Sequence, residues 1–196
     1  MIEEDWTFLA VDQFNKRVQT VQRRGWYPIG SNPTIEVSGS RKSVTVLKAV
    51  THEGDSLHCW TEENLTAQHG IRFLDALQSE FGEKLIIFLD QASYFYAKDL
   101  WEFVSEKRST ECVDDTSVER VQSEKLQVWY FPAHLPELNP VEGYWNNLNG
   151  WFKYRLIEDL SELKTVLRTA LDEVTYSGFF SYLCSDDRPE KLCKDF

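Results

Sequence analysis

The chain has 196 residues, of which 42% are hydrophobic and 14% aromatic; this composition fits one globular domain and excludes a disordered or low-complexity protein. No apolar run approaches membrane-spanning length, and the start, Met-Ile-Glu-Glu-Asp, lacks the basic segment of a signal peptide, so we expect a cytoplasmic protein without membrane contact. The formal net charge of −11 argues against a nucleic-acid partner unless cations gather on one face, because phosphate contacts require Lys and Arg.

Short alternating segments at the start of the chain predict strands. The apolar run Trp6–Asp12 ends in an acid and predicts a first strand, and the loose alternation of Val18–Trp26 predicts a second strand paired with the first. Ser43–Val50 predicts a third strand, and a short segment follows at Leu57–Trp60. The connections are of hairpin scale, so we expect an antiparallel meander.

The period of the apolar residues then becomes helical. Asn64–Phe81 predicts a helix that ends before a glycine. Lys84–Asp90 is a continuous apolar run that ends in an acid, which predicts a strand buried on both faces of a sheet. A second helix is predicted over about 99–105, and the polar stretch at about 106–125 has no period and predicts an insertion or mobile loop.

The next segment combines a strand, a proline-rich turn and the start of a helix. Leu126–Phe131 alternates and predicts a strand that Pro132 would end, since proline cannot continue a hydrogen-bonded ladder. Asn139 suits the N-cap, Pro140 the first helical position, and Glu142 then falls at the acid position of a capping box. From this local chemistry alone, Glu142 would simply cap its own helix.

A last amphipathic helix is predicted from Asp159 or Ser161 to about Val174. The order of predicted elements, β-β-β-α-β-α-β-α, indicates an α/β protein whose sheet is flanked by helices. We expect one domain over residues 1–183 and a weakly structured tail over residues 184–196.

Three short motifs resemble those of a known enzyme family. The stretch Pro136-Glu-Leu-Asn-Pro-Val-Glu142 resembles the third catalytic motif of the mariner-type transposases, and more closely that of their relatives in the insertion sequence 630 family. In that family the final glutamate completes an Asp-Asp-Glu triad. Leu89-Asp90-Gln-Ala-Ser-Tyr resembles the second motif, in which an aspartate follows an apolar strand, and Asp12 ends the first predicted strand. The resemblance covers roughly residues 5 to 175.

This resemblance implies a ribonuclease-H-like fold with a mixed five-stranded sheet and the function of a transposase catalytic domain. Such a domain cleaves DNA at transposon ends and transfers the strands into target DNA. Asp12, Asp90 and Glu142 would be the catalytic residues and the ligands of two Mg²⁺ or Mn²⁺ ions, which prefer carboxylate oxygens. Gln91 and Asn139 would orient these ligands.

The resemblance also implies partners and a location. The partners would be transposon-end and target DNA, a second copy of the chain in the active complex, and a helix-turn-helix module that reads the ends and could be encoded separately. The location would be a prokaryotic cytoplasm, in association with the nucleoid.

Cations near the start of the chain are the candidates for contact with DNA. The first 50 residues hold seven Lys and Arg against five acidic residues, so the remainder of the chain carries all of the net negative charge. The candidates are Lys16, Arg17, Arg23, Arg24, Arg41 and Lys42. A solvated hairpin explains Arg23 and Arg24 about as well as a DNA contact does.

Two departures from the family pattern leave alternatives open. Gln91 and Phe95 stand where the family usually has Asn and often His. The alternatives are a decayed or domesticated domain that binds DNA or a partner without cutting, and another ribonuclease-H-like nuclease. Trp145 follows helical spacing, which predicts a core residue and not a platform for bases.

Overall fold

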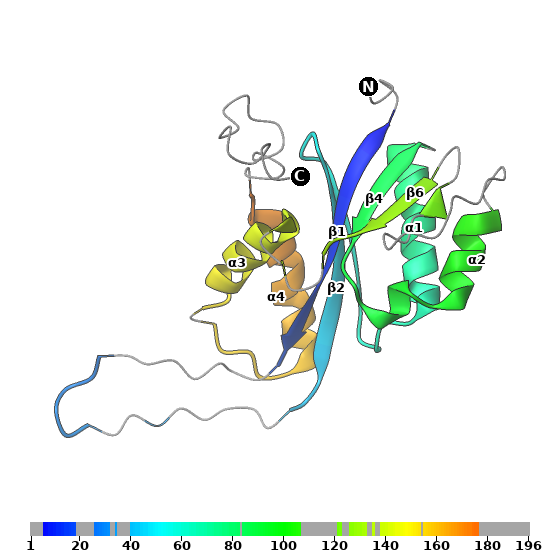
Figure 1. Cartoon of the computed structure of the whole chain (residues 1–196). Coiled ribbons are helices and arrows are strands. Elements are labelled where there is room, and N and C mark those ends of the chain that lie inside the picture. Colours follow the sequence, from blue (N-terminus) through cyan, green and yellow to red (C-terminus); the bar gives the residue numbers. More distant parts are fainter. Residues whose placement is uncertain are drawn as a thin grey trace.

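A mixed sheet with strand order β3-β2-β1-β4-β6-β5 forms the centre of the computed structural model (Figure 1). The structure describes residues 6–18, 26–31, 34, 40–82, 84–106, 121–122, 126–132, 135, 138–153 and 155–176. The strands are β1 (Thr7–Arg17), β2 (Ser43–Thr51), β3 (Ser56–Thr61), β4 (Leu85–Leu89), β5 (Val121–Gln122) and β6 (Leu126–Tyr130). The helices are α1 (Ala67–Phe81), α2 (Lys98–Glu106), α3 (Val141–Trp151) and α4 (Leu160–Glu173), with a short 3₁₀ turn, η1 (Ser93–Phe95), before α2.

The direction of the strands changes at β1. The strands β1, β2 and β3 form the expected antiparallel meander, whereas β4 pairs in parallel with β1, and β6 pairs in parallel with β4. The mixed five-stranded sheet predicted from the sequence is therefore confirmed. The two-residue strand β5 adds an antiparallel edge beside β6.

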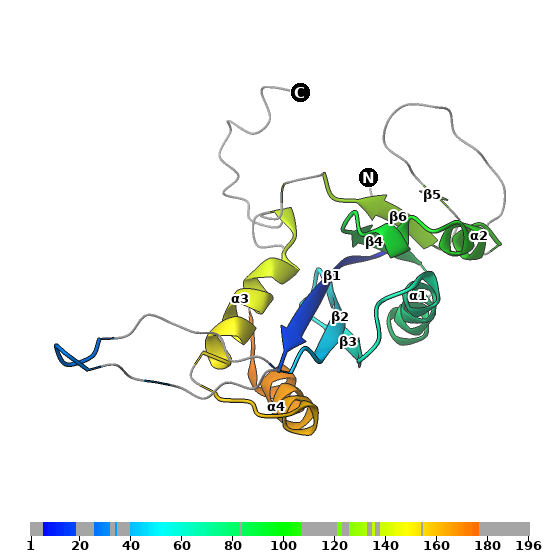
Figure 2. The ribbon, with the colours of Figure 1, turned by 90° about the horizontal axis from the view of Figure 1, so that it is seen from below.

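Helices cover both faces of this sheet, with α3 and α4 on one face and α1 and α2 on the other (Figures 1 and 2). Alternate residues of β1 pack against the two helical layers, because successive side chains of a strand point to opposite faces of the sheet. Leu9 and Val11 belong to the apolar cluster under α1 and α2, and Ala10 and Phe14 belong to the cluster under α3 and α4. Asp12 continues the second series and so points towards α3.

The first strand is longer than the sequence predicted. Its antiparallel pairing with β2 continues from Leu9 opposite Thr51 to Arg17 opposite Ser43, so Asp12 lies in the middle of β1 and not at its end. Among the described strands, β2 (Ser43–Thr51) is the antiparallel partner of β1. The expected second strand at 18–26 falls mainly on residues outside the described ranges, as do most of the insertion at 106–125 and the whole tail at 184–196.

The start of α3 has part of the predicted capping chemistry, but its boundary is shifted by one residue, so Glu142 is the second helical residue and not the acid of a capping box. The Asn139 side chain accepts a hydrogen bond from the backbone N–H of Val141 at 3.1 Å, as an N-cap side chain does. Pro140 precedes the first helical residue, Val141, and is not itself the first helical residue. The start of α4 is capped as expected, because the Asp159 carboxylate accepts from the N–H of Glu162 at 2.8 Å. In the described part of the chain, no helix is long and apolar enough to cross a bilayer.

Candidate active site

The parallel register of β1 and β4 places two of the predicted acids side by side. Ala10 lies opposite Phe88, and β4 ends one residue later, at Leu89. Continuing this register by two residues sets Asp90 beside Asp12, at the level where β4 stops and β1 continues. Neighbouring strands are about 4.8 Å apart, so the two acids come from adjacent positions of the sheet although 78 residues separate them in sequence.

Asp12 is held in a fixed orientation by two donors. Its side chain is only 6% exposed. One carboxylate oxygen, Oδ1, accepts from the backbone N–H of Gln13 at 2.8 Å, and the other, Oδ2, accepts from the indole N–H of Trp145 at 3.0 Å. The Trp145 ring also stacks on Phe14 of β1, with ring centroids 5.1 Å apart. The first turns of α3 are thus fastened to the strand that carries Asp12.

Glu142 reaches the same place from α3. It lies in the first turn of this helix, three residues before Trp145, and residues at this spacing share one helical face. Asn139 adds a second link, since its amide donates to the backbone carbonyl of Val11 at 3.4 Å. Because Val11 adjoins Asp12, this bond joins the turn before α3 to β1 at the level of the acids.

Burial and mutual repulsion of the acids shape the electrostatics of the site. The pKa of Asp12 is raised to about 7, chiefly by burial; the negative charges of Asp90 and Glu142 contribute to the rise, and the donors from Gln13 and Trp145 oppose it. Burial also raises the pKa of Asp90, while the backbone N–H groups of Ala92 and Asp90 oppose that rise. The three predicted acids therefore share one electrostatic environment, in which a cation would be favourable.

The donor set suits a divalent ion of the Mg²⁺ type. Mg²⁺ and Mn²⁺ take carboxylate oxygens as ligands, and Mg²⁺ usually retains waters and phosphate oxygens beside one or two carboxylates. The Asp90 oxygen Oδ1 is buried and has no hydrogen-bond partner among the described residues, so it remains available as a ligand. Among those same residues, no three acidic, His or Cys side chains lie in an arrangement that could hold a metal ion. Ligation of one ion by all three acids would therefore require their side chains to move.

The other predicted site residues have different surroundings. The Gln91 amide donates to the backbone carbonyl of Phe131 at 3.1 Å, which links the ends of β4 and β6. Among the candidate DNA contacts, Lys16 lies over the ring of Phe152 at 4.4 Å from its centroid. Arg17, Arg41 and Lys42 are exposed where β1 ends and β2 begins, and Arg23 and Arg24 lie outside the described residues.

Sequence reasoning missed two side chains next to Asp12. Trp145 is a core residue, as predicted, but it also donates to Asp12; its place one helical turn after Glu142 was the available signal. Lys48 lies opposite Asp12 on β2 and is buried, which lowers its pKa to about 8. Its amine donates to Ser56 Oγ at 3.0 Å and lies over the Tyr144 ring. A lysine in an apolar strand gives no signal of such burial.

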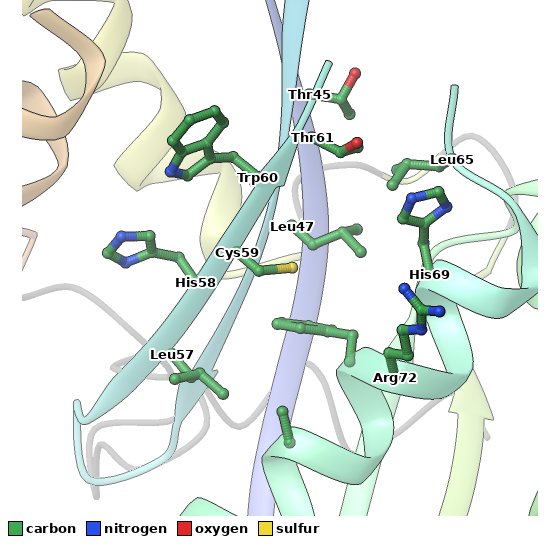
Figure 3. Close-up of a pocket in the computed structure, with 12 residues that line it drawn as sticks. Thr45, Leu47, Leu57, His58, Cys59, Trp60, Thr61, Leu65, His69 and Arg72 are labelled. Atoms are coloured by element: carbon green, nitrogen blue, oxygen red, sulfur yellow. The ribbon is translucent and has the colours of Figure 1, made fainter. Parts of the chain in front are cut away.

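A cavity of about 310 Å³ lies away from the acids, between β2, β3 and α1 (Figure 3). Leu47, Leu57 and Cys59 line it from the strands, and Arg72 and Phe73 line it from α1. Its lining includes none of the three predicted acids, so it is not part of the acidic site.

Comparisons with known proteins agree with this arrangement. The family model of the DDE superfamily endonucleases matches residues 7–164. No curated protein sequence matches the chain. Among solved structures, the Mos1 mariner paired end complex with Mn has a TM-score of 0.61 at 14% identity and covers 86% of this chain and 48% of that chain. A pre-cleavage Mos1 transpososome has a TM-score of 0.58 at 13% identity, covering 92% and 49%.

These similarities define the fold and the family. The chain spans about half the length of the matched Mos1 chains, and at such low identity the likeness concerns the fold, which confirms the predicted ribonuclease-H-like class. The family match covers most of the sequence, including the stretches that carry Asp12, Asp90 and Glu142. This chain belongs to the DDE superfamily endonucleases.

Proposed function

We propose that the chain is the catalytic domain of a DNA transposase, which cleaves DNA at the ends of a mobile element and joins those ends to target DNA. The observation that supports this proposal is the electrostatic influence of two acids on Asp12 of β1: the charges of Asp90, just after β4, and of Glu142, in α3, both raise the pKa of Asp12. The matched Mos1 complexes, described as paired end complexes with Mn and with Mg, support divalent ions and DNA ends as ligands of this domain.

The chemistry would rest on two Mg²⁺ or Mn²⁺ ions. Asp12 would contact both ions, and Asp90 and Glu142 would each complete the ligands of one. When bound, such ions neutralise phosphate charge and activate the attacking oxygen and the leaving oxygen. The protein side chains supply position: Trp145 and the Gln13 N–H fix the Asp12 carboxylate, and Asn139 fixes the start of α3. Positioning and charge neutralisation are most of what phosphoryl transfer requires of a protein.

The experiment that tests this function is nicking of supercoiled DNA by the whole chain in Mg²⁺ or Mn²⁺, by the parent and by variants of the three acids. We assign recognition of specific ends to a helix-turn-helix module other than this α/β domain, and we expect two copies of the chain in the active complex. Nicking by the isolated chain therefore does not require a particular sequence.

The exposed cations at one end of the β1–β2 pair are the proposed DNA contact. Arg17 lies opposite Ser43, and the carbonyl of Lys42 accepts the N–H of Val18 at 3.0 Å, so Arg17 and Lys42 lie on adjacent strands. Arg17 is five residues beyond Asp12 on the same strand, which corresponds to about 17 Å at the rise of a strand. Because Arg17 is an odd number of residues from Asp12, the two side chains belong to opposite faces of the sheet, so a DNA backbone that contacts both would pass the end of the β1–β2 pair.

Replacing Arg17 by Ala should lower the affinity for DNA and should also reduce the dependence of that affinity on salt concentration. Each phosphate contact that is lost lowers the slope of log K against log salt concentration by about 0.9. The matched control is Arg72→Ala, because Arg72 is an exposed arginine on α1 and not on the β1–β2 pair. Fluorescence anisotropy with a labelled duplex across a salt series measures the slope. Equal slopes for Arg17→Ala, Arg72→Ala and the parent would contradict the proposed contact.

A further inference from the structure

Two buried side-chain atoms lack a hydrogen-bond partner in the described part of the chain, and both lie just after β4. They are Oδ1 of Asp90 and the hydroxyl oxygen of Tyr94. Buried polar atoms are nearly always hydrogen-bonded in folded proteins, because an unpaired one retains the full cost of its desolvation. One of these atoms is an acceptor, the other belongs to a donor group, and the two residues are four positions apart.

The hydroxyl of Tyr94 lies close enough to the acidic site to respond to its charges. Burial raises the pKa of Tyr94, and the charges of Asp90 and then Asp12 raise it further. The hydroxyl therefore stays protonated and can only gain by donating to a negative group. The ring is held by Phe95, with ring centroids 4.5 Å apart, and by the apolar cluster under α1 and α2.

The backbone around Tyr94 is fixed by its own hydrogen bonds. The N–H of Phe95 donates to the carbonyl of Ala92 at 2.9 Å, and the hydroxyl of Tyr130 donates to the carbonyl of Phe95 at 2.8 Å. This turn begins two residues after Asp90, and these bonds hold the backbone on both sides of Tyr94. The side chain that the sequence suggested for orienting Asp90, the amide of Gln91, donates to Phe131.

We propose, on the basis of the function proposed above, that Tyr94 is a positioning residue that donates a hydrogen bond to the Asp90 carboxylate when Asp90 binds a divalent ion. The bond would satisfy both unpaired atoms at once. A hydroxyl bound to a carboxylate is among the shorter and stronger hydrogen bonds of proteins. Partners of this kind orient metal ligands, and their loss commonly weakens metal affinity by 10- to 100-fold.

The test compares Tyr94→Phe with Tyr130→Phe. Each change removes one hydroxyl and keeps the ring, and the Tyr130 hydroxyl donates to the backbone carbonyl of Phe95. Mn²⁺ affinity of the whole chain is measured by electron paramagnetic resonance without DNA, so the result does not depend on activity. We expect about 10- to 100-fold weaker Mn²⁺ binding for Tyr94→Phe and parental binding for Tyr130→Phe.

Thermal melts without metal separate positioning from a structural role. The Tyr94 hydroxyl has no partner in the metal-free protein, so Tyr94→Phe should melt at or above the parental temperature, whereas Tyr130→Phe should melt lower. Parental Mn²⁺ affinity in Tyr94→Phe, or an equal loss of affinity in both variants, would overturn the proposal. A lower metal-free melting temperature for Tyr94→Phe would also overturn it.

Asp90→Asn distinguishes failure of this inference from failure of the proposed function. If Asp90→Asn loses Mn²⁺ binding while Tyr94→Phe keeps it, the acidic site stands and Tyr94 has no part in it. If Asp90→Asn also binds Mn²⁺ like the parent, the metal site itself is wrong.

Discussion

Replacing Asp12 by Asn is expected to reduce Mg²⁺-dependent nicking of DNA by at least about 10³-fold, which corresponds to about 4 kcal/mol of transition-state stabilisation. The reason is the role proposed for Asp12, which would contact both ions and on which the charges of Asp90 and Glu142 act. Asn also cannot accept from Gln13 and Trp145 together, because its amide nitrogen is a donor. The new side chain would therefore turn away from one of these N–H groups.

Two controls are needed before a loss of nicking can be assigned to the carboxylate of Asp12. Asp75→Asn makes the same chemical change at an exposed position of α1 and should retain parental activity. Nicking by the parent should occur in Mg²⁺ or Mn²⁺ and disappear with a chelator or in Ca²⁺, whose looser coordination does not organise an in-line reaction. Activity of Asp12→Asn within tenfold of the parent, or nicking that persists in the chelator, would contradict the assignment.

The second large effect expected is on stability: without metal, Asp90→Asn should melt at a higher temperature than the parent at pH 8. Burial raises the pKa of Asp90, so the ionised carboxylate is less stable in the folded protein than in water. The charge of Asp90 also raises the pKa of Asp12. Asn removes this charge at almost constant volume, which should increase stability. Such increases are common where a functional residue is maintained at a cost in stability.

The stability of the metal-free parent should fall with pH, and the sign follows from Asp12. Its pKa is about 7 in the folded chain against an ordinary value of 3.8. Below pH 3.8 both states are protonated; between about pH 4 and 7 only the unfolded chain releases the proton, so stability falls as pH rises. The full loss is on the order of 4 kcal/mol. The advantage of Asp90→Asn should be largest above pH 7 and should shrink towards pH 4.

Mg²⁺ should reverse the order of the two proteins. At about tenfold above the dissociation constant, binding stabilises the parent by about 1.4 kcal/mol, which is a rise of about 3–6 °C in melting temperature for a domain of this size. Asp90→Asn should gain much less. Paired melts with and without Mg²⁺ at fixed ionic strength measure both effects. If the parent shows no Mg²⁺-dependent rise and the variant has no advantage without metal, the acids do not form a working site.

Local patterns were sufficient to predict most of the fold. The continuous apolar run at Lys84–Asp90 and the alternation at Leu126–Phe131 became β4 and β6, and the acidic N-cap at Asp159 begins α4. The length of β1 was not predictable, because Gln13, Asn15 and Arg17 are exposed polar residues. They belong to the strand only through their pairing with β2, a contact that sequence periodicity does not record.

Some residues of the candidate site were predicted from the sequence and others were not. Motif resemblance singled out Asp12, Asp90 and Glu142, and the structure places them in one electrostatic environment. Trp145 was predicted only as a core residue, because an aromatic residue at helical spacing is usually core. Its bond to Asp12 joins residues 133 positions apart in sequence, and the role proposed for Tyr94 likewise depends on the place of one hydroxyl oxygen.

The most direct test of the account is a crystal structure of the chain soaked in Mn²⁺, with the ions located by anomalous scattering. An anomalous peak is expected in contact with a carboxylate oxygen of Asp12 and with one from Asp90 or Glu142, since these three acids are the proposed ligands. A second peak on the other side of Asp12 would agree with two ions. Peaks that contact none of the three acids, or no peak at their carboxylates at saturating Mn²⁺, would contradict the central claim.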